Sequence, residues 1–559
     1  MTSKTVTGTA ATVFAVMLVS VLTSALRGQT PAPQAPPQQG PGAPPQGAAA
    51  PGGAQGGRAG GRGNPAQALF TEQCAGCHGN DLAGGRAPSL FDQKWLATVD
   101  DARLVNSITH GVPNTEMEGF EKSLTEPQIW SLIQYIRTQT GALTPKPQFV
   151  ADPAGLALKT EKATVKVEVL TTELNTPFGM AFLPDGRLLI TERDGRLRFW
   201  SKGSLSEPVK NTPKPHVQQD GGYLDVTIHP KYAQNGWIYL SYSEDQPGYV
   251  APPPAPAAAP VAPAPVDGAR GGGAPGAGGA PGRGGRGGPP PVPSMTVVVR
   301  GKINKNNEWT NQEFIFRAAA DLYTTQGAHY GSRFIWDKEG HLFFTMGERG
   351  NQTNAQDLTK PLGKIHRFND DGSAPKDNPF VNTPGAVKTI WTYGHRNPEG
   401  LAWDPISGKL WESEHGPNGG DEINIIVKGH NYGWGVASKG IQPGITKTSE
   451  AGMDDPVVYY TPSLAPAQIA FYTGSKYPGW KNSSLFVGGL VGQKLLRLEI
   501  AGDKVTKQEV IFDQFGRVRN IAQGPDGFLY VALQDPTGIP GVQLSNPTAG
   551  KLIRFMPVQ

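Results

Sequence analysis

Short runs of hydrophobic residues, each introduced by a turn that contains Gly or Asn, recur along the chain from about Val165 onward. A turn of this kind before a β-prone run is a hairpin signal. Six such units occur, with turns at 184–186, 235–236, 338–340, 406–408, 482–483 and 525–527. Because radial repetition leaves few free sheet edges in a long all-β chain, we predict an all-β six-bladed β-propeller over 161–559. A pair of β-sandwiches is the alternative.

Hydrophobic residues take helical spacing in one earlier segment. The residues with this spacing are Ile129, Trp130, Ile133 and Ile136. Thr125, followed three residues later by Gln128, matches a capping box at the start of a helix. We therefore predict a helix from Thr125 onward, within a small all-α domain over 65–142. A linker over 143–160 joins this domain to the propeller.

Two segments lack the apolar positions that a core requires. Residues 29–64 are rich in Pro, Gly, Ala and Gln, and residues 248–293 have a similar composition with Arg-Gly repeats. Such compositions are typical of disordered or extended chain. We interpret 29–64 as a linker that precedes the helical domain, and 248–293 as a low-complexity surface loop inserted into the propeller.

The N-terminal segment has the pattern of an export signal. Lys4 precedes a mostly apolar stretch over 10–26, which is typical of a secretory signal peptide, here assigned to 1–28. An uncleaved anchor is the alternative, and membrane contact is expected only in that case. The 559 residues carry a formal net charge of +4, and the basic residues are scattered, so the sequence gives no support for a nucleic-acid partner.

Both cysteines of the chain lie in the run Cys74-Ala75-Gly76-Cys77-His78. The spacing C-x-x-C-H is the attachment motif for c-type haem, in which two thioether bonds hold the haem and the histidine binds the iron. A zinc site would need a second pair of ligands, and a redox dithiol would be expected in a βαβ pattern that the neighbouring sequence lacks. We therefore expect haem c at Cys74 and Cys77, with His78 as an axial ligand.

The segment after this motif resembles the C-terminal half of a class I cytochrome c. An irregular stretch ends in Met117 before the helix predicted from Thr125. The resemblance implies that Met117 is the sixth iron ligand, and Met/His ligation raises the reduction potential of a haem. His110 is the rival ligand. Haem is attached to such motifs after export, so this expectation agrees with the signal peptide.

Several polar loops of the propeller carry residues suited to chemistry. A histidine at a loop-to-strand edge, as at His329 and His395, can act as a general base near neutral pH. Arg396 offers a planar fork for an anionic oxygen, and residues 414–424 concentrate the oxygen ligands that Ca²⁺ prefers. Arg517 and Arg519 are expected on one face of a strand. Each of these features also has a purely structural interpretation as a hydrogen-bonded or solvated group.

Together these loops resemble the soluble glucose and aldose sugar dehydrogenases that depend on pyrroloquinoline quinone (PQQ). The matching stretches are DDGSAPKDNPF, GHRNPEGLAW, SEHGPNGGDEIN, VKGHNYGW and RVRNIAQGPDGFLYV. They span most of the region from Val165 to Pro557. The resemblance implies a six-bladed propeller with PQQ over its axis.

The resemblance also implies a role for individual residues. His329 is the expected catalytic base, and Arg396 and Asn397 are expected to stabilise negative charge on the quinone oxygen. The other implied PQQ contacts are Arg517, Arg519 and Gln352. The implied calcium ligands are Gly416 and Pro417 for the activating ion, and Glu422 and Tyr432 for a second, structural ion.

Three positions depart from the family pattern. Ala328 stands where glucose-oxidising members have an acidic residue that orients the histidine, and Asp220 stands where a glutamine is usual. Val491 occupies the position of a PQQ-binding lysine, with Lys494 three residues further on. These departures concern the substrate and the affinity for PQQ.

We therefore expect a periplasmic or exported quinohaemoprotein oxidoreductase. It would oxidise an aldose sugar or a related alcohol at PQQ and pass the electrons through its own haem c to an external acceptor, such as a cytochrome or the respiratory chain. Two alternatives stay open from the sequence. One is a Ca²⁺-dependent propeller lactonase or esterase, and the other is a cofactor-free propeller that serves as a binding module attached to a cytochrome.

Overall fold

The structure is a computed structural model. It describes residues 65–80, 82–90, 101–113, 115–143, 148–250, 291–417, 419–440, 442, 444–461, 463–536 and 549–558. The predicted signal peptide, the predicted linker over 29–64 and most of the low-complexity insertion lie outside the described residues. Every residue for which a site role is predicted lies within them.

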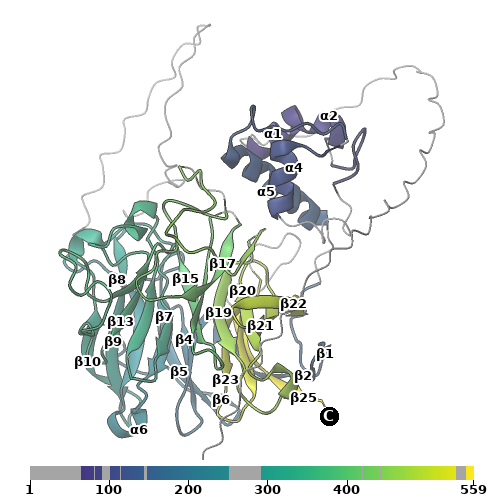
Figure 1. Cartoon of the computed structure of the whole chain (residues 1–559). Helices are drawn as coiled ribbons and strands as arrows, with labels where there is room; N and C mark the ends of the chain where they lie inside the picture. Colours follow the sequence, from purple (N-terminus) through teal and green to yellow (C-terminus); the bar gives the residue numbers. More distant parts are fainter. Residues whose placement is uncertain are drawn as a thin grey trace, which may run out of the picture. The chain divides into compact units, whose positions relative to one another are not determined.

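Six antiparallel sheets form the predicted six-bladed propeller (Figure 1). The first contains β3 (Pro177–Phe182), β4 (Leu188–Glu192), β5 (Arg196–Ser201) and β6 (Ser204–Leu205). The second contains β7 (Tyr223–Ile228), β8 (Ile238–Asp245), β9 (Ser294–Ile303) and β10 (Trp309–Phe316). The third contains β11 (Phe334–Trp336), β12 (Leu342–Met346), β13 (Lys364–Phe368) and β14 (Ile390–Tyr393).

The remaining three sheets complete the ring. The fourth contains β15 (Pro398–Trp403), β16 (Leu410–Glu414), β17 (Asp421–Ile426) and β18 (Val458–Tyr460). The fifth contains β19 (Pro466–Phe471), β20 (Ser484–Gly489), β21 (Leu495–Ala501) and β22 (Lys504–Phe512). The sixth contains β23 (Arg517–Gln523), β24 (Leu529–Gln534), β25 (Ala549–Pro557), β2 (Thr164–Asn175) and β1 (Ala157–Lys159).

The sixth sheet is built from both ends of the propeller sequence. Its strand order is β1-β2-β25-β24-β23, and β2 pairs with β25 from Val165 opposite Pro557 to Asn175 opposite Ala549. Buried side chains of β2, β24 and β25 share a core with the fifth sheet. The ring is therefore closed by strands that are far apart in the sequence.

Strand direction separates the connections into two ends of the propeller. Each of the six predicted turns joins the first strand of a sheet to the second, which confirms those hairpins. We call this the turn end, and α6 (Tyr232–Asn235) marks it at the foot of Figure 1. The connections from second to third strands and from one sheet to the next reach the opposite end, which we call the loop end.

Hydroxyl groups on second strands bind neighbouring sheets together. The Thr345 hydroxyl on β12 donates to the carbonyl of Pro398, and the Ser413 hydroxyl on β16 donates to the carbonyl of Ala467, both over 2.8 Å. The Thr191 hydroxyl on β4 donates to the Leu224 carbonyl in the same way. All three hydroxyls are fully buried, and each acceptor carbonyl belongs to the first strand of the next sheet. These bonds fix the inner strands around the axis.

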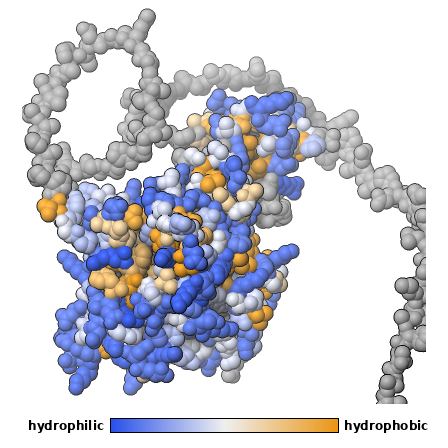
Figure 2. All heavy atoms as spheres, turned by 60° about the vertical axis from the view of Figure 1, so that its left-hand side comes forward, coloured by the Kyte–Doolittle hydropathy of each residue, from blue (hydrophilic) through white to orange (hydrophobic). Residues whose placement is uncertain are grey.

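The insertion predicted at 248–293 joins β8 to β9 at the loop end. The Gln246 N–H donates to the Pro293 carbonyl over 2.8 Å, so its two ends are held together. Three short 3₁₀ helices also occur in propeller connections: η1 (Ala320–Leu322), η2 (Gln352–Ala355) and η3 (Pro478–Trp480). Hydrophilic residues cover most of the described surface in the view of Figure 2, with hydrophobic residues in separate groups between them.

The all-α domain contains four helices among its described residues. They are α1 (Pro65–Gln73), α2 (Ala75–His78), α4 (Asp101–His110) and α5 (Glu126–Leu143). The Thr125 N–H donates to the Gln128 side-chain carbonyl over 2.8 Å, so the predicted capping contact begins α5. Its apolar face, with Ile129 and Ile133, packs on Phe70 in one core. None of the described helices is long and apolar enough to cross a membrane.

Candidate functional site

The site residues predicted in the propeller gather at the loop end. His329, Asp220 and the pair Arg396 and Asn397 lie on connections between sheets. The residues on connections from second to third strands are Gln352, Gly416, Pro417, Val491 and Lys494. Arg517 begins β23, Arg519 follows two residues later, and Glu422 lies near the start of β17. The topology therefore brings together residues that are up to 300 positions apart.

A buried carboxylate holds the imidazole of His329. The Nδ1 atom of His329 lies 2.6 Å from Oε1 of Glu348, which lies two residues after the end of β12 and is 2% exposed. A carboxylate on Nδ1 fixes that proton and leaves Nε2 as the acceptor, the arrangement found where histidine acts as a base. Glu348 thus supplies the orienting carboxylate that Ala328 cannot. Sequence analysis did not identify Glu348, because it lies 19 positions from the histidine.

Arg396 and Asn397 are tied to both neighbouring loops. The Arg396 N–H donates to Oε2 of Glu414 over 2.6 Å, and its guanidinium donates to the His415 carbonyl over 3.2 Å. The Asn397 side-chain oxygen accepts the Gly331 N–H over 2.9 Å, which links this pair to the loop of His329. Burial lowers the pKa of Arg396, and its Nε has no partner among the described residues.

Arg517 and Arg519 form a second cationic group. The Arg519 Nε donates to the Gln534 side chain over 2.9 Å. Burial, and then the charge of Arg517, lower the pKa of Arg519 to about 10. Among the described residues, neither guanidinium lies within 4.0 Å of a carboxylate, and Nε of Arg517 has no hydrogen-bond partner. Asp220 acts on both only at longer range.

This donor set fits a ligand with several carboxylates. Buried or half-buried guanidinium groups without a counter-ion are costly, and an anion that reaches them removes the cost. PQQ, the cofactor implied by the sequence resemblance, carries such carboxylates. Arg517 and Arg519 would hold them, with Arg396 at the quinone oxygen, and the orphaned Nε atoms of Arg396 and Arg517 are the observation that favours this fit.

Three predicted positions contribute less directly. Val491 is 59% exposed on the connection between β20 and β21, and the ammonium of Lys494 forms no ion pair with the described residues. Gln352 begins η2, where its main-chain carbonyl lies against Gly435. Its side-chain oxygen is buried without a partner in the described part of the chain. The structure therefore shows no cation at the position of the family lysine.

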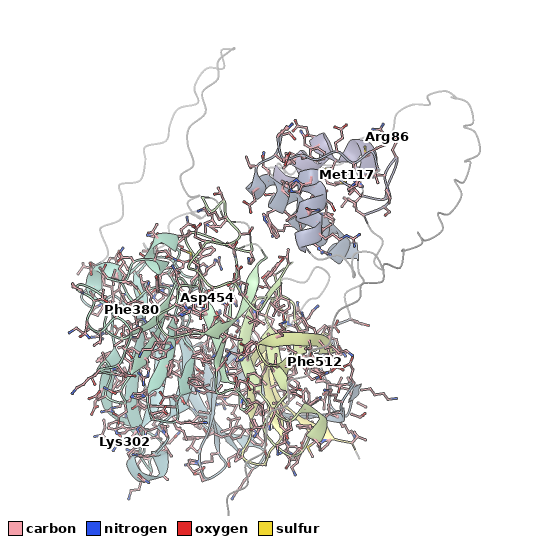
Figure 3. All side chains as sticks on the ribbon, in the orientation of Figure 1. Arg86, Met117, Lys302, Phe380, Asp454 and Phe512 are labelled. Atoms are coloured by element: carbon pink, nitrogen blue, oxygen red, sulfur yellow. The ribbon has the colours of Figure 1, made fainter. Side chains whose placement is uncertain are left out.

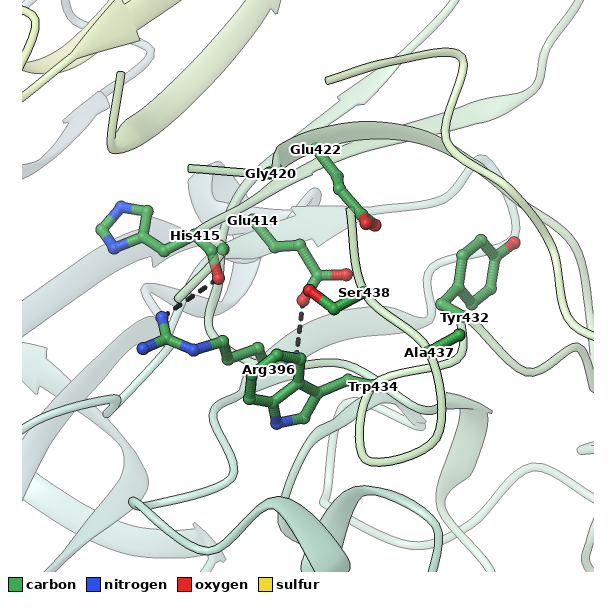
Figure 4. Close-up of a pocket in the computed structure, with 10 residues that line it drawn as sticks. Arg396, Glu414, His415, Gly420, Glu422, Tyr432, Trp434, Ala437 and Ser438 are labelled. Atoms are coloured by element: carbon green, nitrogen blue, oxygen red, sulfur yellow. Dashed lines mark hydrogen bonds between the residues drawn. The ribbon is translucent and has the colours of Figure 1, made fainter. Parts of the chain in front are cut away.

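A pocket lined in part by Arg396 contains three of the four residues predicted to bind calcium, Gly416, Glu422 and Tyr432, but not Pro417 (Figure 4). The Gly416 N–H donates to the Asp421 carboxylate over 2.8 Å. A side chain at Gly416 would collide with the carbonyls of Gly419 and Gly420, so the tight loop requires glycine there. The pocket is lined by Arg396, Glu414, His415, Gly416, Gly420, Glu422, Tyr432, Trp434, Ala437 and Ser438.

Three carboxylates and one amide meet below this pocket. The Asn424 side-chain N–H₂ donates to Glu412 over 3.1 Å, to Glu422 over 3.2 Å and to Glu414 over 3.4 Å. Burial raises the pKa of Glu412 and of Glu422, and the neighbouring Glu414 charge raises both further. Oε1 of Glu412 and Oδ1 of Asn424 have no partner among the described residues. These oxygens suit a hard cation such as Ca²⁺.

Sequence analysis included Glu414, Glu422 and Asn424 in a stretch suited to Ca²⁺ and named Glu422 as a ligand, but it missed Glu412. Glu412 lies two residues before Glu414 on β16, so their side chains share one face, which is the signal that could have revealed it. Tyr432, the other predicted ligand, uses its phenol elsewhere. Its hydroxyl donates to the Ile425 carbonyl over 2.7 Å, and its ring stacks on His395 with 4.7 Å between centroids. The same hydroxyl accepts the Val427 N–H over 2.8 Å, so both of these contacts of the phenol are with main-chain groups.

The helical domain presents the haem motif at its second helix. The His78 ring Nδ1 lies 3.2 Å from the Pro88 carbonyl, a contact that fixes the ring and leaves Nε2 for iron. Met117 packs against the domain core (Figure 3), whereas the side chain of His110 is 60% exposed and lies 3.3 Å from Glu121. Burial, and then the neighbouring Cys77, raise the pKa of the Cys74 thiol to about 11. These contacts favour Met117 over His110 as the second ligand.

Comparison with known proteins agrees with this arrangement. Residues 174–540 match the family described as Glucose / Sorbosone dehydrogenase, and residues 61–136 match the family described as Cytochrome C oxidase, cbb3-type, subunit III. The aldose sugar dehydrogenase YliI of Escherichia coli is 38% identical over 392 residues, which cover 68% of this chain and 93% of that protein. The quinoprotein glucose dehydrogenase B of Acinetobacter calcoaceticus is 26% identical over 479 residues, covering 69% and 90%.

Solved structures give the same result. The apo form of the soluble aldose sugar dehydrogenase from Escherichia coli aligns with a TM-score of 0.58 and 35% identity, covering 70% of this chain and 100% of that one. The helical region also has a relative: the cytochrome c subunit of a quinone alcohol dehydrogenase from Gluconacetobacter polyoxogenes is 34% identical over 100 residues, which cover 16% of this chain and 21% of that protein. The predicted resemblance is confirmed, and this chain belongs to the glucose/sorbosone dehydrogenase family, with a cytochrome c domain of the cbb3-type subunit III family before its propeller.

Proposed function

We propose that this protein is an exported, PQQ-dependent dehydrogenase that oxidises an aldose or a related alcohol and passes the electrons to its own haem c. The observation that carries the proposal is the His329–Glu348 pair, which lies on the same end of the propeller as three arginines that form no ion pair with any described carboxylate. A base of this kind beside an anion-binding group suits removal of a hydride and a proton from a hydroxyl-bearing carbon.

Each residue of the site has a separate proposed role in the reaction. Nε2 of His329 takes the proton of the substrate hydroxyl, and Glu348 stabilises the resulting imidazolium through Nδ1. PQQ, when bound, would supply the acceptor for the hydride that leaves the carbon bearing this hydroxyl. Arg396 would donate to the developing negative charge, and its burial strengthens that interaction because water is excluded. Asn397 would join it by exchanging the bond that its side-chain N–H₂ donates to Glu399 over 3.0 Å.

Calcium has two proposed positions in this site. The main-chain carbonyls of Gly416 and Pro417 would hold an ion that polarises the quinone, in keeping with the sequence resemblance. A second ion would occupy the cluster of Glu412, Glu414 and Glu422, where it would neutralise carboxylates that are costly to bury. The bond that the Arg396 main-chain N–H donates to Glu414 connects this second position to the catalytic loop.

The haem is the proposed route by which electrons from the substrate leave the protein. Oxidation of one hydroxyl group releases two electrons, whereas one haem iron accepts one at a time. The haem must therefore be reduced and reoxidised twice for each substrate molecule, with an external acceptor taking each electron. The attachment run at Cys74 and Cys77 is the observation that favours a redox enzyme over a hydrolase.

The proposal is tested by reconstitution. Purified full-length protein that carries haem is supplied with PQQ and Ca²⁺ under anaerobic conditions, a panel of aldoses and simple alcohols is added, and the visible spectrum of the haem is followed. We expect reduction of the haem by at least one aldose, at a rate that falls by at least about 100-fold in His329→Ala. If the haem stays oxidised with every substrate, or if His329→Ala reduces it as fast as the wild type, the proposal is wrong.

A further inference from the structure

A buried arginine that takes no part in the steps above lies directly after Glu348. Arg349 is 2% exposed, and among the described residues no carboxylate lies within 4.0 Å of its guanidinium. The guanidinium instead donates to main-chain carbonyls of one loop. Its Nη2 bonds to Gln326 over 2.5 Å, and its Nη1 bonds to Ala328. A third bond reaches the Ser294 carbonyl over 3.3 Å.

The same guanidinium lies over an aromatic ring of that loop. Its central carbon is 3.6 Å from the centroid of the Tyr330 ring, which is within the range of a cation–π interaction. Ala328 and Tyr330 are the two neighbours of His329. The cation therefore fixes the chain on both sides of the predicted base, while the preceding Glu348 holds the imidazole itself.

The loop needs this support because its backbone is strained. His329 has φ 58° and Ser332 has φ 87°, both in the region that favours glycine. Non-glycine residues persist in such conformations only when the surrounding contacts determine them, at a cost of about 1–3 kcal/mol each. The Arg349 bonds to the carbonyls before His329 are contacts of this kind. Without them the loop can relax and carry Nε2 away from the substrate.

A role in packing alone does not account for this arginine. A buried charge without a counter-ion is expensive, and an apolar side chain of similar volume would fill the space at lower cost. Arg367, by contrast, is a buried arginine of the same sheet that does have acidic partners, with Asp377 at 2.8 Å. Arg349 thus differs from Arg367 in its hydrogen-bond partners, which are main-chain carbonyls of the loop that carries His329.

We propose that Arg349 is a positioning residue that holds the loop from Gln326 to Tyr330 in the conformation in which His329 can accept the substrate proton. This inference rests on the proposed function. It extends that function from the catalytic pair to the residue that sets the geometry of the pair. The bonds to the carbonyls of Gln326 and Ala328 and the stacking on Tyr330 are the observations that carry it.

The first measurement needs neither PQQ nor substrate. In ¹⁵N-histidine-labelled protein with reduced haem, the His329 Nδ1 proton held by Glu348 should give a low-field resonance, which His329→Gln identifies by its loss. We expect this resonance to vanish through solvent exchange in Arg349→Met and to persist in Arg367→Met, the matched buried control. A resonance that survives unchanged in Arg349→Met overturns the inference.

The second measurement is kinetic. In the reconstituted enzyme Arg349→Met should lower kcat by about 100-fold, as expected when a catalytic group is displaced by about 1 Å, with KM within threefold of the wild type. Arg349→Lys, which keeps the charge but loses the fork, should recover part of the loss. If Arg349→Met does not fold, the His329 resonance and the kcat of Arg349→Lys test the inference in its place. Wild-type kcat in both Arg349 variants contradicts the inference, whereas an inactive wild type contradicts the proposed function and leaves the resonance as the test of Arg349.

Discussion

Replacing Arg517 by methionine should stabilise the protein without PQQ and weaken the binding of PQQ. Arg517 and Arg519 lie two positions apart on β23, half-buried and without a carboxylate within 4.0 Å among the described residues. Methionine keeps most of the apolar stem of arginine and removes the charge. Two opposite effects are therefore expected from one substitution, and they separate a binding residue from a structural one.

The size of the stabilisation follows from the pKa of the neighbouring arginine. Burial, and then Arg517, lower the pKa of Arg519 from its ordinary value to about 10, which corresponds to about 3 kcal/mol of unfavourable free energy. Burial is the larger cause, and partial exposure screens the repulsion. We therefore assign about 1 kcal/mol to the charge of Arg517. The loss of a buried partner for a ligand carboxylate costs about 2–5 kcal/mol, or about 30- to 5,000-fold in Kd.

Urea unfolding measures the first effect, and titration of PQQ with the fluorescence of the protein as readout measures the second. Arg187→Met is the matched control, because Arg187 lies at the turn end in an exposed ion pair with Asp185. It should leave the affinity for PQQ unchanged. The reasoning is refuted if Arg517→Met is less stable than the wild type without PQQ, or if it binds PQQ with wild-type affinity.

Three other predictions concern separate parts of the molecule. Burial lowers the pKa of His366 to about 4, so between pH 6.5 and pH 4 the unfolded chain binds a proton that the folded chain does not. The free energy of unfolding should therefore decrease by up to about 3 kcal/mol as the pH is lowered through this range. Urea unfolding at pH 7 and pH 4.5 should show a smaller decrease in His366→Gln than in the wild type, and an equal decrease contradicts the assignment. Glu412→Gln should weaken calcium binding at least about tenfold, seen as a smaller drop of Tm on chelation than in the control Glu207→Gln, which changes an exposed residue outside both candidate metal groups; equal drops would exclude Glu412 as a ligand. Replacing both Cys74 and Cys77 by serine should abolish haem staining on a denaturing gel while the propeller keeps its thermal transition, and retained staining would place the attachment elsewhere.

The six propeller blades could be predicted from the sequence because their signal is local. A glycine turn such as 184–186 and the β-prone run after it lie within ten residues, and the same unit occurs six times. The haem motif is local in the same sense, since Cys74, Cys77 and His78 are neighbours. These features need no knowledge of how distant segments pair.

The parts that sequence analysis missed depend on such pairing. Glu348 reaches His329 only because the chain between them forms β11 and β12 and returns to the same end. Asn424 meets Glu412 because the register of β16 and β17 sets these two residues opposite each other. A search restricted to matching motifs assigns known positions, such as Ala328, but cannot show that another strand supplies the missing carboxylate.

The closure of the sixth sheet orders the events of folding. β2 lies near the start of the propeller sequence, but its partner β25 is the last strand, so the ring cannot close until nearly all of the chain is available. Contacts between distant segments form slowly, and until then β2 presents an unpaired edge that favours association with other chains. The cytochrome domain, by contrast, precedes β2 and has its own core. The cytochrome domain can therefore acquire its haem and fold while the propeller is still open, and loss of the last strand alone would leave a haem protein with an unclosed ring.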